Sequence, residues 1–190
     1  TDGQGGSQAA ARSLNLAPAN DAPVALQVSG TVSEDGPAVT VAASFVDVDA
    51  SDTQTFQIVN PQVLQGGITN NNDGTFTYDP LQAFQSLAAG QTATETFTYR
   101  VTDAAGASSE STVTITITGV NDAPDAVNDT ASTNEDVPVI IDVLANDTDV
   151  DAGASKTITH IDGQVASVGV AINLTGGGTA TLNANGMISY

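Results

Sequence analysis

The sequence has very few cationic residues. Its 190 residues include 3 Lys and Arg against 22 Asp and Glu, which gives a formal net charge of −19 at pH 7. The three cations, Arg12, Arg100 and Lys156, are far apart along the chain. Nucleic-acid binding needs a basic face that neutralises phosphates, and docking on anionic lipid needs a similar basic cluster. The composition therefore argues against both kinds of partner.

Cysteine and tryptophan are absent, and aromatic residues make up 4% of the chain. Without cysteine, the fold has no disulfides, thiolate nucleophiles or thiolate metal ligands. No apolar run approaches the roughly 20 residues that span a bilayer, so we expect no membrane insertion. The first residues lack the basic and apolar regions of a signal peptide, and we expect the chain to be a piece of a longer protein. Hydrophobic residues, at 40%, are sufficient for a core.

Short runs of alternating apolar and polar residues fill much of the chain after residue 19. Val113, Ile115 and Ile117 alternate with threonines, and Phe97 and Tyr99 show the same alternation. Such a period of two is the signature of half-buried strands. Turn residues interrupt the runs at short spacing, which is typical of an all-β sandwich.

Two stretches differ from this strand pattern. Residues 1–19 are rich in Gly, Ser, Gln and Ala, and we interpret them as a flexible N-terminal segment. A short edge strand around Leu14 and Leu16 is left open as an alternative. Apolar residues three positions apart between Leu81 and Ala89 allow a helical turn there. We expect no other helix.

An internal repeat indicates the domain organisation. Four landmarks occur twice in the same order: Asn-Asp-Ala-Pro, Glu-Asp-x-Pro, Asp-Val-Asp-Ala, and an Asp-Gly or Asn-Gly turn leading to a tyrosine. They begin at Asn20, Glu34, Asp47 and Asp73, and again at Asn121, Glu135, Asp149 and Asn185. The period of about 100 residues matches one immunoglobulin-like sandwich. We therefore predict tandem immunoglobulin-like β-sandwiches at residues 20–120 and 121–190.

The second repeat contains fewer predicted strands than the first. Further alternating runs follow Tyr78 in the first repeat, whereas the second repeat stops at Tyr190. An incomplete sandwich exposes sheet edges and half of a core. We expect this second sandwich to be truncated at its C-terminus. Its missing strands would come from a continuation of the chain, a partner chain or the N-terminal segment.

The acidic residues gather at these landmarks, in turns between the predicted strands. Side chains at i and i+2 of an extended segment point to the same side, so Asp47 and Asp49 direct two carboxylates to one point. Like charges that close repel unless a cation lies between them. Ca²⁺ binds roughly six to eight oxygen ligands, and the lack of nitrogen and sulfur ligands disfavours zinc and copper. The duplicated motif favours Ca²⁺ over the alternative that the acids only provide turns and solubility.

These motifs resemble those of the cadherin-like and related immunoglobulin-like (VCBS-type) repeats of bacterial RTX-type surface adhesins. The motifs at Glu34 and Glu135 resemble the early Glu motif of cadherin repeats, and the two Asp-Val-Asp motifs resemble its Asp-x-Asp motif. Asp103 resembles the late Ala-x-Asp motif, and the motif at Asn121 resembles the linker. The resemblance covers residues 20–190. Gly119 departs from it, because the cadherin linker has its first Asp there, and this implies fewer or weaker ions.

The resemblance implies Ca²⁺ at two places. The junction between the domains would use Glu34, Asn121, Asp122, Asp149 and Asp151. The outer end of the first domain would use Asn20, Asp21, Asp47, Asp49 and Asp103, and would be weaker because no preceding domain supplies a Glu. Glu135, the counterpart of Glu34 in the second repeat, completes the predicted ligand set, and Asp136 and Asp147 are secondary candidates.

The resemblance also implies an extracellular, structural role. We expect a calcium-rigidified tandem repeat module of a large adhesin at the bacterial cell surface, acting as an extender in cell adhesion or biofilm formation. Its partners would be neighbouring repeats of the same polypeptide, with polysaccharide or another cell surface as external partners. The alternative is a calcium-dependent lectin-like module for exopolysaccharide.

A lectin needs an open ion site beside an exposed aromatic residue, whereas Tyr78 and Tyr99 have the pattern of core residues. We expect no enzymatic activity. His160 has no catalytic constellation around it, and glycosidase carboxylates work in a cleft with aromatic sugar platforms.

Overall fold

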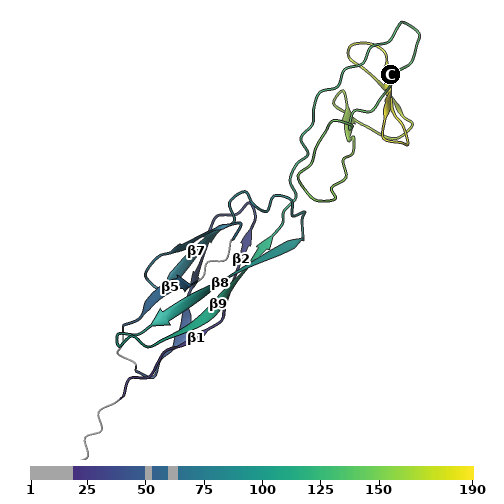
Figure 1. Ribbon diagram of the computed structural model, residues 1–190. Helices are drawn as coiled ribbons and strands as arrows, with labels where there is room; N and C mark the ends of the chain where they lie inside the picture. Colours follow the sequence, from purple (N-terminus) through teal and green to yellow (C-terminus); the bar gives the residue numbers. More distant parts are fainter. Residues whose placement is uncertain (1–18, 50–52, 60–63) are drawn as a thin grey trace, which may run out of the picture.

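The computed structural model describes residues 19–49, 53–59 and 64–190. The segment 1–18, and with it the alternative of a strand around Leu14 and Leu16, lies outside the described residues. The described chain consists of strands and turns and contains no helix, which confirms the predicted all-β class. Two domains lie end to end, a larger one followed by a smaller one (Figure 1).

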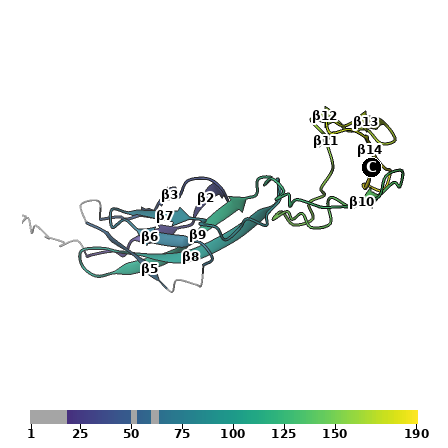
Figure 2. The same ribbon diagram turned by 90° about the horizontal axis from the view of Figure 1, so that it is seen from above.

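The first domain is a sandwich of two facing sheets (Figure 2). One sheet has the strand order β2-β9-β8-β5, the other has the order β3-β7-β6, and β1 pairs with β4. β2 and β9 are parallel, and the remaining pairs are antiparallel. The strands are β1 (Val24–Leu26), β2 (Val28–Ser33), β3 (Val39–Ala42), β4 (Ser44–Val46), β5 (Thr55–Val59), β6 (Gly67–Asn70), β7 (Thr75–Asp79), β8 (Thr92–Thr102) and β9 (Ser108–Thr118).

The core of the first domain lies between these two sheets. Val113, Ile115 and Ile117 of β9 are fully buried, and the threonines between them lie on the opposite face. Phe76 of β7 meets Phe97 of β8 edge-on, with ring centroids 5.5 Å apart. The period-two alternation in the sequence therefore corresponds to the inward and outward faces of the strands.

Two tyrosines extend this core, as their sequence pattern predicts. Tyr78 and Tyr99 are both 0% exposed. The Tyr99 hydroxyl lies 2.6 Å from the carbonyl oxygen of Leu26 and 2.5 Å from that of Ser44, so it ties β1 and β4 to the core. The Tyr78 hydroxyl donates to Glu95 Oε2 at 2.6 Å. Their polar ends are thus satisfied inside the sandwich.

The second domain is smaller and more open. Its main sheet has the order β10-β15-β14-β13, and β11 and β12 form a separate hairpin. Ile161, Ile172, Ala180 and Leu182 form its buried core, which is much smaller than that of the first domain. The strands are β10 (Ile140–Ile141), β11 (His160–Ile161), β12 (Gln164–Val165), β13 (Ala171–Asn173), β14 (Thr179–Leu182) and β15 (Ile188–Ser189).

The helical turn expected between Leu81 and Ala89 does not form. Leu81 has a φ of 55°, in the left-handed region, which a right-handed helix does not accept. The stretch instead makes successive turns, in which Ala83 N–H donates to Pro80 O and Leu87 N–H donates to Phe84 O. The apolar spacing arises because Phe84 and Leu87 pack against the sandwich core.

Candidate metal centre

The topology brings Glu34 beside the linker between the two domains. β2 and β9 run parallel with Ser33 opposite Thr118, so the chain leaves both strands at the same end of the sheet. Glu34 N–H donates to Thr118 O at 3.0 Å, and Glu34 Oε1 accepts a hydrogen bond from Val120 N–H at 2.8 Å. Glu34 is only 1% exposed. The first domain thus holds a buried carboxylate against the start of the linker.

The second domain contributes its Asp-Val-Asp-Ala loop to the same place. Asp149 Oδ1 accepts a hydrogen bond from Asp151 N–H at 3.0 Å, which closes the loop. Asp151 Oδ2 accepts a hydrogen bond from Asp122 N–H in the linker, also at 3.0 Å. Asp151 is 6% exposed. The loop is therefore folded around its own carboxylates and attached to the linker.

Three carboxylates meet at this junction. Glu34, Asp122 and Asp151 each place one oxygen within 4.8 Å of an oxygen of the other two. Each also has one buried oxygen without a hydrogen-bond partner: Glu34 Oε2, Asp122 Oδ2 and Asp151 Oδ1. Burying an unpartnered polar atom is unfavourable, and three adjacent negative charges repel one another. A cation between the three oxygens would give each of them a partner and would offset the repulsion.

The electrostatics of Asp122 agree with this geometry. Burial raises the pKa of Asp122 above its ordinary value, and the negative charges of Asp35, Asp151 and Asp149 raise it further. Without a cation, the site therefore disfavours the ionised form of this carboxyl. The donor set consists of carboxylate oxygens, which fits a hard cation such as Ca²⁺ and not zinc or copper. A bound ion would join groups from both domains and from the linker.

At the outer end of the first domain, the predicted metal ligands have hydrogen-bond partners within the protein. Asp103 is buried, but Asn20 Nδ2 donates to its Oδ2 at 2.9 Å and Ala107 N–H to its Oδ1 at 2.8 Å. The Asn20 hydrogen bond is the main cause that lowers the pKa of Asp103. Asp49 accepts a hydrogen bond from Asp21 N–H at 2.7 Å, and Asp47 accepts one from Asp49 N–H at 3.0 Å. Hydrogen bonds thus join Asn20 to Asp103, Asp21 to Asp49 and Asp49 to Asp47, but among the described residues no three carboxylates converge at this end.

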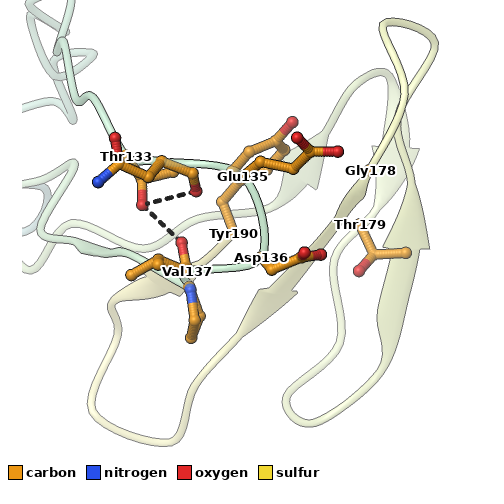
Figure 3. A pocket seen from close by; sticks show the side chains of 9 residues that line it. Thr133, Glu135, Asp136, Val137, Gly178, Thr179 and Tyr190 are labelled. Carbon is orange, nitrogen blue, oxygen red and sulfur yellow. Dashed lines mark hydrogen bonds between the residues drawn. The ribbon is translucent and has the colours of Figure 1, made fainter.

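The other predicted residues are placed less centrally. Asn121 is exposed, and its Nδ2 donates to Asp122 O. Asp147 Oδ1 accepts a hydrogen bond from Val127 N–H within the second domain. Glu135 and Asp136 are exposed and line a cavity of about 590 Å³ away from the junction, next to Tyr190 (Figure 3). They therefore belong to a different region from Glu34.

Sequence reasoning missed two participants at the junction. Asp35 acts on the charge balance of Asp122, and Gln85 Nε2 donates to Asp35 Oδ1 at 2.8 Å. The repeated Glu-Asp pair was the available signal for Asp35. Nothing in the sequence indicates that the loop containing Gln85 packs at this end of the domain.

The fold and the junction define a class of protein, tandem β-sandwich repeats joined by an acidic linker. The model of the bacterial cadherin-like domain matches residues 20–119, and that of the bacterial Ig domain matches residues 121–190. The first match covers more than half of the sequence, so the chain belongs to the bacterial cadherin-like domain family, with a bacterial Ig domain following it. No curated protein matches the chain.

Solved structures with similar architecture include cadherin repeats. Human CDH23 EC21-23 is 16% identical with a TM-score of 0.50, over 93% of this chain and 63% of that one. Protocadherin gamma B7 extracellular cadherin domains 1–4 are 16% identical with a TM-score of 0.46, over 88% and 40%. A nucleoside hydrolase-related hypothetical protein from Saccharophagus degradans is 17% identical with a TM-score of 0.36, over 52% and 26%. The chain thus spans less than two thirds of each, and the similarity to CDH23 concerns the fold alone.

Within the described residues, no helix is long and apolar enough to cross a membrane.

Proposed function

We propose that the chain is a structural spacer of a bacterial surface adhesin, in which Ca²⁺ at the domain junction fixes the relative orientation of the cadherin-like and Ig-like domains. The observation that carries this proposal is the set of three buried, unpartnered carboxylate oxygens drawn from the first domain, the linker and the second domain. Without the ion, repulsion among these groups loosens the junction. With the ion, the same groups hold the domains together.

The proposal places the protein outside the cell. Extracellular calcium modules bind with Kd values of about 10⁻⁴–10⁻³ M, so such a site fills at external calcium levels and stays empty in the cytosol. Membership in bacterial cadherin-like and Ig domain families supports a surface location. An RTX-type adhesin in cell adhesion or biofilm formation is the specific setting we propose, with neighbouring repeats of the same polypeptide as its direct partners. The role is structural and not catalytic.

The test combines small-angle scattering with thermal unfolding, in calcium and in EDTA. With these Kd values, 10 mM Ca²⁺ stabilises the folded junction by about 1.4–2.7 kcal/mol. We expect calcium to raise the unfolding temperature by several degrees and to narrow the range of interdomain shapes. Glu34→Gln should abolish most of both effects.

Asp129→Asn is the matched control, because it removes the same charge from an exposed residue outside the junction. It should respond to calcium as the wild type does. If calcium changes neither shape nor stability of the wild-type chain, the proposal is wrong.

A second candidate function, a calcium-dependent lectin-like module for exopolysaccharide, is favoured by one specific observation. Tyr190 is 47% exposed and lines the cavity in the Ig-like domain together with Glu135 and Asp136 (Figure 3). Exposed aromatic rings beside polar groups are suited to stacking on sugars. A glycan-binding screen with and without calcium, repeated on Tyr190→Ala, separates this function from the spacer. Binding that depends on both calcium and Tyr190 would support the lectin.

A further inference from the structure

A second contact crosses the domain junction, and it involves no carboxylate. Ala152 N–H in the Ig-like domain donates to Ser86 O at 3.0 Å. Ser86 belongs to residues 80–91 of the cadherin-like domain, which connect β7 to β8 and which we name the 80–91 loop. Because both groups are backbone atoms, this contact needs no metal and no particular side chain at either position.

The 80–91 loop is anchored firmly to its own domain. Phe84 is 6% exposed and belongs to the sandwich core, and Leu87 packs against the same core. Leu87 N–H donates to Phe84 O at 2.9 Å, which closes a turn around Ser86. Ser86 O is therefore held at a fixed point of the first domain.

The same loop also holds the start of the linker. Gly119 N–H donates to Gln91 O at 2.9 Å, and Gly90 N–H donates to Gly119 O at 3.4 Å. A Cβ on Gly119 would lie 2.5 Å from Ala88 O and closer still to Leu87 O. The close approach of loop and linker therefore requires glycine at position 119, so this position has no side chain that could bind an ion.

The unpartnered oxygens at the junction are enough to form one cation site. Asp35 and Asp149 act on Asp122 through their charge, but neither belongs to this cluster and neither has a buried oxygen without a hydrogen-bond partner. Glu34, Asp122 and Asp151 form the one cluster of metal-ligating side chains found among the described residues. One group of three converging oxygens is one cation site.

We propose that this junction takes a single divalent cation and that the 80–91 loop supplies a second, metal-independent attachment in place of further ions. The inference rests on the proposed function and specifies how many ions it needs. Two bodies joined through one ion and a linker can still rotate about that point. The Ser86–Ala152 contact is a second point of attachment, and it fixes this rotation.

The first part of the test counts ions. Native mass spectrometry in Ca²⁺ should show that Glu34→Gln binds one ion fewer than the wild type, whereas Asp129→Asn binds the wild-type number. A loss of two or more ions in Glu34→Gln would overturn the single-ion assignment.

The second part of the test separates the loop from the ion. Because the chain has no cysteine, Thr96→Cys and Gln164→Cys, both at exposed positions, give two unique spin-label sites, one in each domain. In the wild-type background, calcium should narrow the distance distribution between the labels. Gly119→Ala should displace the loop and keep the distribution broad in calcium. At saturating calcium this variant should still bind one ion at the junction, because Glu34, Asp122 and Asp151 are all retained.

Gly176→Ala is the matched control, because a Cβ at that glycine meets no atom within 4 Å. Ala152→Pro removes the donor of the interdomain hydrogen bond without touching the first domain, and Ala152→Gly retains that donor. A narrow distribution in both Gly119→Ala and Ala152→Pro would overturn the role of the loop. The proposed function itself would be wrong if the wild-type chain did not bind calcium, or if calcium did not narrow the distance distribution between the labels.

Discussion

The domain junction and the outer end of the cadherin-like domain carry the same loop motif and the same hydrogen bonds. In both, the second Asp of Asp-Val-Asp-Ala accepts a hydrogen bond from the N–H of the Asp in an Asn-Asp-Ala-Pro motif. It also donates its own N–H to the first Asp of the loop. The pairs are Asp21 to Asp49 (2.7 Å) and Asp49 to Asp47 (3.0 Å), and Asp122 to Asp151 (3.0 Å) and Asp151 to Asp149 (3.0 Å). Local sequence therefore determines the shape of this loop at both places.

The two ends differ in the acid that faces the loop. At the outer end, two hydrogen bonds, from Asn20 and Ala107, stabilise the ionised carboxylate of Asp103. At the junction, Glu34, Asp122 and Asp151 each have one buried carboxylate oxygen without a hydrogen-bond partner. The same Asp-Val-Asp-Ala loop therefore occurs with a hydrogen-bonded acid at one end and with three unpartnered carboxylate oxygens at the other. The acid supplied from outside the loop makes this difference.

The largest expected difference between the two ends follows from substituting the equivalent Asp at each of them. Asp151→Asn should weaken calcium binding at the junction by at least about tenfold, because it removes the charge of a buried ligand. Asp49→Asn should leave junction binding unchanged. Isothermal titration calorimetry of both variants measures the two effects. Equal losses of affinity would show that the two ends work in the same way.

A second comparison concerns stability in EDTA. Glu34→Gln should raise the unfolding temperature there by a few degrees, because its amide can donate to the neighbouring carboxylates and one repelling charge is gone. In calcium, the same variant should be less stable than the wild type. Asp103→Asn should lower the unfolding temperature in both conditions, because Asp103 already has donors for its charge. Scanning calorimetry of the two variants tests whether the effect of Glu34→Gln on the unfolding temperature changes sign between EDTA and calcium.

A uniform effect would contradict the distinction between the two ends. If Glu34→Gln destabilises the chain equally in EDTA and in calcium, Glu34 is a structural hydrogen-bond acceptor and not a metal ligand. If the effect of Asp103→Asn on the unfolding temperature changes sign with calcium, the outer end also contains a metal site.

Much of the fold was predictable, because alternation has a direct physical meaning. Val113, Ile115 and Ile117 alternate in the sequence and are buried on one face of β9. The stretch after Leu81 misled the same reasoning, because a three-residue apolar spacing fits a turn that inserts Phe84 into the core as well as it fits a helix. The parallel pairing of β2 with β9 has no local signal, since it joins segments far apart in the chain.

The residue types of the candidate site were predictable from the sequence. Which of these acids already have hydrogen-bond partners was less predictable. The resemblance of the repeated motifs to cadherin-like repeats implied Glu34, Asp122 and Asp151, and the structure brings these three together. The Ala107 contact with Asp103 lies within the turn between β8 and β9, but spacing alone could not show that Asn20 already donates to Asp103, because 83 residues separate the two positions. The contribution of the 80–91 loop was invisible for the same reason.

The smallest expected effect is a difference in titration between the two ends in EDTA. The pKa of Asp103 lies below its ordinary value of 3.8, chiefly because Asn20 donates to it. Its contribution to stability is therefore present above that value and is lost as the pH falls through the lowered pKa. The pKa of Asp122 lies above 3.8, chiefly because of burial. Its contribution is full below 3.8 and is lost as the pH rises through the raised pKa.

NMR titration of the side-chain carboxyl carbons resolves these opposite shifts within one sample. Acidification from neutral pH in EDTA should first relieve repulsion at the junction, before it weakens the outer end. Calcium should move the midpoint of Asp122 to lower pH, because a bound cation favours the ionised form, and should leave Asp103 nearly unchanged. Parallel shifts of both residues would mean that the outer cradle binds calcium as the junction does, and the distinction between the two ends would then be wrong.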